Sequence, residues 1–322
     1  MSESKLLFEC RICKSQTAGE QFTAREMYKG TRDSFNYVFC STCGTLQLTN
    51  PPKDYAYYYE GYYSLGSGTL KIHPIKRLIW KLQLLTFPWF GDFILKHFKK
   101  KLLEVRSLRG LPRKAEWKIL DVGCGSGGLL KFLTQVGFAN CLGCDPFIEA
   151  NLKYENGLQI LKTGIEDIEG AFDLIMLHHA IEHVPNPDVV FSQIARLMKP
   201  SGYCILRFPN IRSIEFRRYK ENWWGVHAPY HTFIYSQESI ELLAKNSGLR
   251  VETSYCDSRW DHYLSSEEYS LDIDHQSPLS YRNGGGVHVS SETALFKERA
   301  SHYDRLGIGD WIVYILRHDH GK

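Results

Sequence analysis

The sequence predicts an α/β protein organised around a doubly wound, largely parallel sheet. Residues 119–122 are mostly apolar, as in a buried strand, and a cluster of glycines follows them at once. From Leu129 to Val136, apolar residues then recur at helical spacing. A strand, a glycine turn and a helix make the first half of a nucleotide-binding βαβ unit, in which the helix N-terminus faces the ligand.

The remaining elements are predicted from apolar runs and turn signals. Strands are expected at residues 140–145, 158–161, 172–177, 203–210, 250–255 and 310–316, and helices at residues 188–198 and from an N-cap at Ser236 to near Gly248. A further helical region spans residues 70–110 and is broken near Pro88. Residues 257–290 are polar, and we expect an irregular surface excursion or lid there.

Two Cys-x-x-Cys pairs stand near the N-terminus. Cys10 and Cys13 form the first pair, Cys40 and Cys43 form the second, and 26 residues separate them. Four thiolates in two such pairs are typical of a structural, tetrahedral zinc site, which leaves no position for water. The alternative is four unrelated buried cysteines. We expect a bound Zn²⁺ that stabilises a small fold and takes no part in chemistry.

The number of cysteines indicates the cellular compartment of the protein. The chain has nine cysteines and no secretory pattern at its start, so we expect a reducing compartment, the cytoplasm. Cys141 and Cys144 form a third Cys-x-x-Cys pair, but they fall in a predicted strand, where positions three apart point to opposite faces. We therefore expect both of them in the core.

A basic stretch precedes the glycine turn. Residues 70–114 hold twelve Lys or Arg but only Asp92 and Glu104, a charge of +10 against −7 for the rest of the chain. On an apolar helical pattern, this charge suits an anionic membrane surface or substrate, and a solvated helix face is the alternative. Six tyrosines in residues 55–63 suit either an aromatic wall over a ligand or a packed hinge. We predict a zinc module with its tyrosine-rich connector at 1–68, a basic helical cap or linker at 69–115, and the main domain at 116–322.

The run from Asp121 to Gly127 resembles the first motif of class I S-adenosylmethionine (AdoMet) methyltransferases. The glycines alone also fit the dinucleotide fingerprint, but a carboxylate at Asp121 attracts the cationic methionine end of AdoMet and repels a pyrophosphate. The zinc pairs, this motif and residues 182–185 follow one another as in a group of these enzymes that carries a four-cysteine zinc module. That group includes sugar C-methyltransferases and enzymes of surface-polysaccharide pathways.

The resemblance covers the chain from Asp121 onward and implies a Rossmann-like sheet of seven strands, the last one antiparallel, with the ligand at the carboxyl ends of the strands. Asp145, 22 residues after Gly123, is at the offset of a carboxylate that accepts from both ribose hydroxyls. In the related enzymes, adenine lies where Ile165 stands here, with an acidic residue accepting from its amino group. The predicted donor-site residues are Asp121, Gly123, Gly125, Gly127, Asp145, Pro146, Ile165, Glu166, Asp167 and His178.

The acceptor site is predicted from histidines, because a base must remove the acceptor's proton and imidazole titrates near neutrality. His231 is our first candidate. It stands where related sugar C-methyltransferases carry a Glu-His pair, although Tyr230 replaces the glutamate here. The other candidates are His178, His179 and His183. Trp223 and Trp224 suit either stacking on a sugar or the core.

His179, Glu182 and His183 are similar to the Glu-x-x-Glu-His pattern of ubiquinone-pathway O-methyltransferases, in which these side chains can bind a divalent ion. A histidine replaces the first glutamate in this chain. The alternative for His183 is a structural role in its loop.

Three functions compete. Methylation of a small, sugar-like acceptor is our first hypothesis, with a peripheral contact to an anionic membrane as a further expectation. RNA methylation is the second, because some ribosomal-RNA methyltransferases also begin with a four-cysteine zinc module and the helical stretch is basic. The modest net charge of +3 and the tryptophan-rich loop favour a small ligand instead. The third is a non-catalytic scaffold with the AdoMet-binding fold. The intact donor-site residues Asp121, Gly123, Gly125 and Asp145 argue against it.

Overall fold

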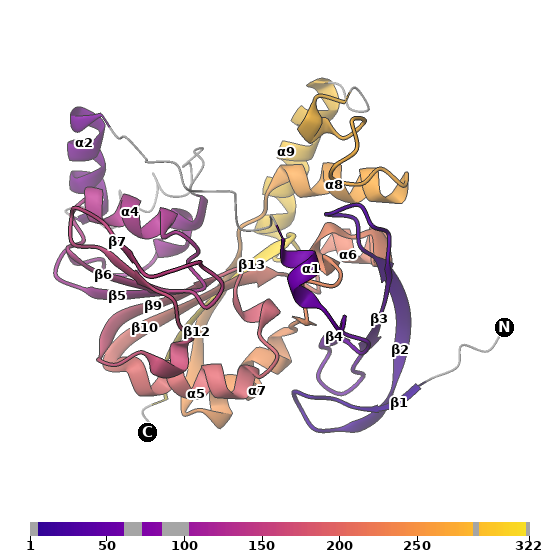
Figure 1. The fold of residues 1–322 in the computed structure, drawn as a ribbon, viewed down its shortest axis with the longest axis horizontal. Helices are drawn as coiled ribbons and strands as arrows, with labels where there is room; N and C mark the ends of the chain where they lie inside the picture. The colour runs from indigo at the N-terminus through magenta and orange to yellow at the C-terminus, as the bar shows by residue number, and fades with distance from the viewer. Residues whose placement is uncertain (1–5, 61–72, 86–102, 286–289, 320–322) are drawn as a thin grey trace.

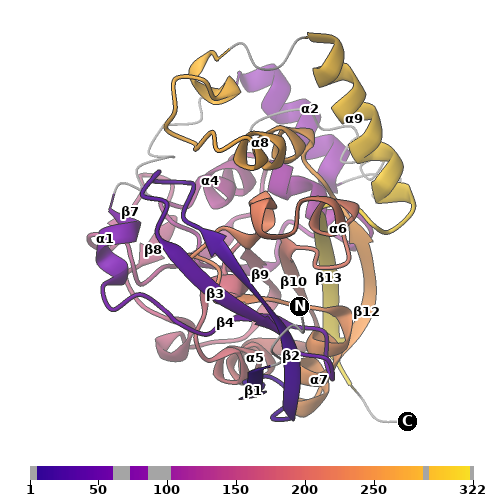
Figure 2. The same cartoon turned by 90° about the vertical axis from the view of Figure 1, so that its right-hand side faces the viewer.

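The computed structural model describes residues 6–60, 73–85, 103–285 and 290–319 (Figure 1). A large central sheet carries helices on both faces, and a smaller sheet of mostly N-terminal strands lies beside it (Figures 1 and 2). The α/β fold class predicted from the sequence is confirmed.

The central sheet has eight strands among the described residues, in the order β12–β13–β10–β9–β5–β6–β8–β7. Their bounds are β5 Lys118–Val122, β6 Asn140–Cys144, β7 Leu152–Lys153, β8 Gln159–Leu161, β9 Phe172–His178, β10 Met198–Pro209, β12 Leu249–Cys256 and β13 Trp311–His318. Strands β8, β6, β5, β9 and β10 pair in parallel, and β13 runs antiparallel between β10 and β12. The predicted count of seven misses β7, a two-residue strand antiparallel to β8, because two residues give no apolar run.

Two apolar layers cover the faces of this sheet. The helices that form them are α2 Pro74–Leu85 and α4 Gly128–Gln135 on one face, and α5 Pro187–Leu197 and α7 Gln237–Asn246 on the other (Figure 1). Alternate strand residues enter different layers, so Leu174 packs with the first and Ile175 with the second. Cys141 and Cys144 divide in the same way, which confirms that both belong to the core.

The N-terminal strands form a second, antiparallel sheet. Its strands are β1 Leu6–Glu9, β2 Gln16–Arg25, β3 Ser34–Phe39, β4 Leu46–Leu48 and β11 Phe233–Ile234. Strand β11 comes from the main domain and pairs with β4. The buried Tyr37 hydroxyl also donates to the His231 carbonyl at 2.9 Å. The sheet is therefore tied directly to the loop that carries our first candidate base.

The sequence predicts an irregular excursion or lid at residues 257–290, and this prediction is wrong for the part that forms helix. Helix α8 (Trp260–Ser270) fills the first half of this range, and α9 (Ser290–Arg305) begins at its end. Eight of the eleven α8 residues are buried, and five of the eight are polar or charged. His262, for example, bonds Asp310 Oδ2 through Nδ1 at 2.9 Å. Because the buried face of α8 is largely polar, apolar periodicity does not reveal this helix.

The basic stretch is described only in part. Its described elements are helix α2 and the 3-10 helix η2 (Leu103–Leu108), and the expected break at Pro88 lies outside the described residues. On α2, Ile75 and Leu78 are 64% and 58% exposed beside the exposed Arg77. Contact of this stretch with an anionic membrane stays a prediction. No helix in the described part of the chain is long and apolar enough to cross a bilayer.

Short helices complete the described fold. They are α1 Tyr55–Tyr59, η3 Ile165–Asp167, η4 Ile181–His183, α6 Ile214–Tyr219, η5 Lys220–Asn222, η6 Trp224–Val226 and η7 Tyr281–Asn283. Helix α1 occupies the tyrosine-dense stretch, and η4 follows directly from the end of β9. Most of these helices connect the two sheets or follow the strand ends that carry the predicted site.

The N-cap predicted at Ser236 is confirmed, and it offers a test of the fold. Ser236 Oγ accepts from Ser239 N at 3.0 Å and donates to the Cys43 carbonyl, so one hydroxyl caps α7 and holds the cysteine loop. We expect Ser236→Ala to lower the free energy of unfolding by about 0.5–2 kcal/mol. Urea unfolding measures this loss. The exposed Ser201→Ala is the control, and an equal effect in both variants would contradict the capping role.

Candidate active site

A glycine-rich turn follows β5 at the carboxyl end of the central sheet. Gly123, Gly125 and Gly127 have φ angles of 71°, 53° and 74°, in the left-handed region that favours glycine. A Cβ on Gly123 would lie 2.6 Å from Ala180 Cβ, and a Cβ on Gly127 would lie 2.6 Å from Ile160 Cδ1. The turn therefore packs closely against Ala180, just after β9, where a Cβ on Gly123 has no room, and the positive φ at all three positions favours glycine.

Asp145 follows β6 and is buried beside this turn. Its Oδ2 accepts from Gly125 N at 2.8 Å, and its Oδ1 accepts from Phe147 N at 2.8 Å. These two bonds fix the carboxylate in place, and each oxygen has a further lone pair. The carboxylate can therefore accept from two neighbouring hydroxyl groups of a ligand.

Asp121 and His178 face each other at the ends of β5 and β9. Asp121 Oδ1 and His178 Nδ1 are 3.8 Å apart, and burial raises the pKa of Asp121. The Ser107 hydroxyl donates its one hydrogen to the Glu104 carbonyl at 2.6 Å, so it accepts from His178 Nε2, 2.7 Å away. The Nδ1 atom of His178 faces the Asp121 carboxylate.

The other predicted donor-site residues lie at the neighbouring strand ends. Ile165, at the start of η3, is buried in the core, whereas Glu166 and Asp167 are exposed. Pro146, directly after Asp145, is exposed as well. The structure thus brings the predicted donor residues to one edge of the sheet, with the carboxylates of Asp121 and Asp145 buried inside it.

Tyr59 links helix α1 to this edge. Its ring stacks on the exposed ring of Phe147, with centroids 5.6 Å apart and an interplanar angle of 7°. Its hydroxyl lies 3.0 Å from His183 Nδ1. Neighbouring Tyr58 packs edge-on against Phe35 of the N-terminal sheet. The tyrosine-dense helix α1 therefore packs between the two sheets, as expected of a hinge. It also borders the predicted site, as expected of an aromatic wall.

Both ring nitrogens of His179 are engaged. Arg207 Nη1 lies 2.6 Å from His179 Nε2, and because a guanidinium can only donate, Nε2 accepts. Nδ1 therefore carries the hydrogen and donates to Glu182 Oε1 at 3.2 Å. Burial and the charge of Arg207 hold the pKa of His179 well below its usual value. In this arrangement His179 has no lone pair for an acceptor's proton.

Glu182 lies fully buried in η4, next to these histidines. Its Oε1 accepts from His179, whereas its Oε2 has no hydrogen-bond partner among the described residues. Burial raises the pKa of this carboxyl to about 8. The Glu182 carbonyl accepts from Thr232 N at 2.8 Å, which holds η4 against the segment leading to β11.

His183 and His231 share one orientation. His231 Nδ1 lies 2.9 Å from the Gly225 carbonyl, and His183 Nδ1 lies 2.9 Å from the Tyr230 carbonyl. A carbonyl only accepts, so each Nδ1 carries the hydrogen and each Nε2 carries the lone pair. His231 Nε2 is 4.0 Å from Glu182 Oε1. Burial lowers the pKa of both rings, that of His183 to about 4.

The two tryptophans of the loop differ in their surroundings. Trp223 is 1% exposed, and its Nε1 donates to Asp310 Oδ1 at 2.6 Å. Trp224 is half-buried and stacks on His275, with centroids 5.5 Å apart. Trp223 therefore belongs to the core and cannot stack on a sugar, while Trp224 already stacks on a residue of the protein.

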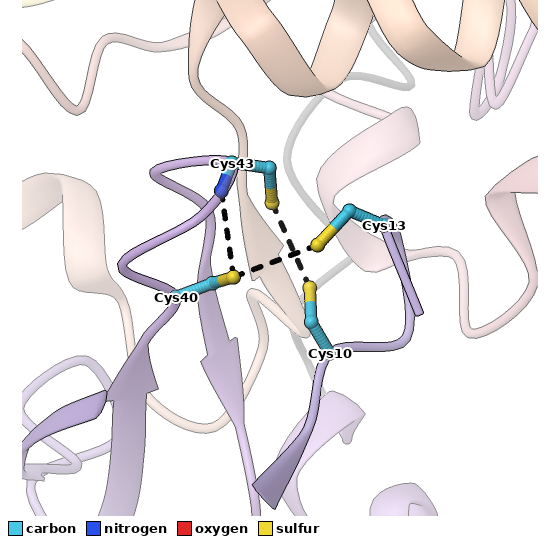
Figure 3. A group of neighbouring side chains, drawn as sticks. All are labelled: Cys10, Cys13, Cys40 and Cys43. Carbon is cyan, nitrogen blue, oxygen red and sulfur yellow. Dashed lines mark hydrogen bonds between the residues drawn. The ribbon is translucent and has the colours of Figure 1, made fainter. Parts of the chain in front are cut away.

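The four N-terminal cysteines converge, as Figure 3 shows. Cys10 and Cys43 Sγ are 3.6 Å apart, and Cys13 and Cys40 Sγ are 3.7 Å apart. Sulfurs at the corners of a tetrahedral zinc site with Zn–S bonds near 2.3 Å lie about 3.8 Å apart. The spacing thus fits zinc and is far too long for a disulfide. A hydrogen bond from Cys10 lowers the pKa of Cys43 to about 5.

A protein family described as methyltransferase domain matches residues 94–254, half of the 322-residue chain. The chain belongs to this family. Ubiquinone biosynthesis O-methyltransferase of Dechloromonas aromatica is 39% identical over 100 residues, which cover 28% of this chain and 43% of that protein. The enzyme of the same name from Rickettsia bellii is 29% identical over 154 residues, which cover 43% of this chain and 63% of that protein.

The chain thus spans less than two thirds of the length of these curated relatives. Among solved structures, a mycolic acid cyclopropane synthase complexed with SAH and CTAB is 18% identical. That similarity covers 77% of this chain and 99% of the synthase, with a TM-score of 0.45.

Sequence reasoning missed a buried ion pair in this methyltransferase domain. Arg207 and Asp257 are both fully buried, and Arg207 Nε donates to Asp257 Oδ2 at 3.1 Å. The guanidinium also lies over the Trp311 ring, 4.1 Å from its centroid. A signal was present, because an arginine inside the apolar run of residues 203–210 is a buried cation that needs a partner.

We expect Arg207→Met to lower the free energy of unfolding by about 1.5–3 kcal/mol. The substitution removes one of two guanidinium partners of the buried Asp257 and the donor to His179 Nε2, while Arg106 stays 2.7 Å from Asp257 Oδ1. Arg250→Met is the matched control, because its pair with Glu252 is exposed, and we expect a loss of about 1 kcal/mol or less. Equal losses in urea unfolding of the two variants would contradict this account.

Proposed function

We propose that the chain transfers a methyl group from AdoMet to a small acceptor. The observation that supports this donor best is the pair of buried carboxylates, Asp121 and Asp145, at the glycine turn. AdoMet brings a sulfonium and an ammonium group, which this negative site attracts, whereas a dinucleotide brings a pyrophosphate, which it repels. Membership of a methyltransferase family supports the same chemistry.

In this proposal, AdoMet lies across the carboxyl ends of β5, β6 and β9. Asp145 accepts from the two ribose hydroxyls, and Asp121, with His178 beside it, lies at the methionine end. The left-handed glycines let the backbone approach the ligand closely. Ile165 packs against adenine, and Glu166 or Asp167 accepts from the adenine amino group. Exposed carboxylates at these two positions are accessible to such a ligand.

The acceptor is proposed to be a small molecule, sugar-like as the resemblance to enzymes with a four-cysteine zinc module implies. It would lie at the histidines of η4 and of the loop before β11. Its nucleophilic atom forms a bond to the methyl carbon as the carbon–sulfur bond breaks, which leaves neutral S-adenosylhomocysteine, and its proton passes to a base. His231 is the proposed base, because its Nε2 carries the lone pair. His183 is the alternative on the same side, and His178 lies nearer the donor. His179 is no longer a candidate, because its Nε2 already accepts from Arg207 and its Nδ1 donates to Glu182.

A phenolic hydroxyl is a second candidate acceptor. The observation that favours it is the similarity to ubiquinone biosynthesis O-methyltransferases over 100 and 154 residues. Such an acceptor would meet the same histidines and would also need its proton removed. Methylation of RNA is the third candidate, favoured only by the basic stretch.

Incubation with methyl-labelled AdoMet tests the proposal. Nucleotide sugars, lipid-linked glycans, dihydroxyphenols and RNA would be offered separately, and label recovered in each acceptor would be counted. We expect label in the sugar fraction, and label in the phenols alone would establish the second candidate. Label in RNA alone would contradict a small acceptor, and label in no fraction while AdoMet binds would favour a scaffold role.

The proposed role of Asp145 predicts a specific loss of donor binding. We expect Asp145→Ala to weaken AdoMet binding by about ten- to a hundredfold, since a charged hydrogen-bond acceptor is worth about 1.5–3 kcal/mol. Isothermal titration calorimetry measures the dissociation constants. Asp188→Ala, an exposed carboxylate in the first turn of α5, is the control and should bind AdoMet as the wild type does. Unchanged affinity in Asp145→Ala would refute this role.

We further propose one structural Zn²⁺ per chain, held by Cys10, Cys13, Cys40 and Cys43. The tetrahedral sulfur spacing supports it, and four thiolates close the site to water. We expect Cys13→Ser to lose most of the zinc found in freshly purified, reduced protein, as elemental analysis would measure. Cys141→Ser, in the sheet core, should keep it. Wild-type protein without zinc would overturn the proposal.

A further inference from the structure

A buried aspartate–histidine pair connects helix α8 to the residue before β13. His262 of α8 is 3% exposed, and its Nδ1 lies 2.9 Å from Asp310 Oδ2. Asp310 Oδ1 accepts from Trp223 Nε1 at 2.6 Å, and the Asp310 backbone N donates to the Ser258 hydroxyl at 2.6 Å. These contacts fix Asp310, and Asp310 in turn fixes the orientation of the His262 ring. The proposed methyl transfer uses neither side chain.

This orientation makes Nε2 the basic atom of His262. A carboxylate accepts, so Nδ1 carries the hydrogen of the neutral ring and Nε2 carries the lone pair. Burial lowers the pKa of His262, so this lone pair is present at neutral pH. Nε2 has no hydrogen-bond partner among the described residues. His262 is therefore a buried hydrogen-bond acceptor whose second contact is open to a ligand.

Aromatic contacts link His262 to the proposed base. Its ring centroid lies 5.6 Å from that of Trp224, and the Trp224 ring also contacts His227, at 4.9 Å. The His227 ring in turn lies 5.1 Å from that of His231. The Ser266 hydroxyl of α8 accepts from the backbone N of Trp224 at 3.0 Å, which holds the helix against the same loop. The buried polar face of α8 thus borders the proposed acceptor site.

Trp311 provides an unused donor in the same region. Its ring centroid lies 4.4 Å from that of His262 and 3.8 Å from that of His179, the residue that follows β9. Trp311 Nε1 is buried and has no hydrogen-bond partner among the described residues. A buried N–H without a partner is costly, because folding removes the water that it would otherwise bind. A ligand that reaches this place can offset that cost.

We infer that His262 and Trp311 recognise hydroxyl groups of the acceptor away from its nucleophilic atom. A hydroxyl donates one hydrogen and accepts through its lone pairs, so hydroxyls satisfy both the His262 lone pair and the Trp311 N–H. An alkyl group satisfies neither. The acceptor therefore carries at least one hydroxyl besides the atom that receives the methyl group. Asp310 acts through His262 and is a positioning residue.

This inference rests on the proposed function and narrows its class of acceptors. A keto or methyl ether group has no hydrogen to donate, so its oxygen would face the His262 lone pair unpaired, at the cost of a buried acceptor on each side. The site thus favours a sugar or a dihydroxyphenol over an acceptor with a single hydroxyl. Recognition is a matter of binding, so it can be measured without methyl transfer.

Calorimetry with the full-length, zinc-loaded protein tests the inference. The protein is saturated with S-adenosylhomocysteine and titrated with catechol and phenol, and separately with methyl glucoside and its monodeoxy analogues. The two arms distinguish a phenolic from a sugar-like acceptor. In one of them, we expect the wild type to bind the compound with the additional hydroxyl about three- to tenfold more tightly, the effect of one hydrogen bond.

Three variants assign this preference. His262→Asn keeps an amide donor for Asp310 but removes the Nε2 lone pair, and it should abolish the preference. Trp311→Phe keeps an aromatic ring but removes the N–H, and it should reduce the preference. His275→Ala is the matched control and should keep it, because the His275 ring also stacks on Trp224 but makes no side-chain hydrogen bond among the described residues.

Binding of S-adenosylhomocysteine, measured on the same samples, shows that each variant is folded. Absence of the preference from both arms in the wild type would overturn the inference, as would its persistence in folded His262→Asn. If His262→Asn does not fold, full preference in Trp311→Phe would overturn it. Equal loss in His275→Ala would assign the preference to ring packing and also overturn it. The preference in a protein that transfers no label from AdoMet would instead refute only the proposed function.

Discussion

The parallel pairing of β5 with β6 and β9 is the constraint on which the rest of the structure depends. It brings the ends of three strands to one edge, so that Asp121, Asp145 and His178 lie near one another although they are distant in the sequence. The glycine turn fits closely over this edge, because a Cβ on Gly123 would lie 2.6 Å from Ala180 Cβ. The same turn fixes Asp145, whose Oδ2 accepts from Gly125 N.

A buried polar network continues from this edge toward the second sheet. Arg207, in the middle of β10, holds Asp257 on one side and His179 on the other, and His179 in turn holds Glu182. Such a buried polar network is stable only while each member keeps its partner. This network holds η4 next to the loop that carries His231. Strand β11 follows that loop directly and pairs with β4 of the N-terminal sheet. The cysteine module is therefore tied to the loop of the proposed base His231.

The local features of the chain could be predicted, because they rest on short-range chemistry. The strand and glycine turn at residues 119–128, the N-cap at Ser236 and the opposite faces of Cys141 and Cys144 follow from spacing alone. Helix α8 could not, since its buried face is polar and its partners, such as Asp310, lie far along the chain. The grouping of His231 with Glu182 also depends on a loop that only the tertiary fold positions.

Calorimetric titration of the wild-type chain with AdoMet and, separately, with NADH tests the central claim most directly. The claim is that buried carboxylates at the glycine turn select a cationic donor over a pyrophosphate. We expect saturable binding of one AdoMet per chain and no binding of NADH. Saturable binding of NADH without binding of AdoMet would contradict it.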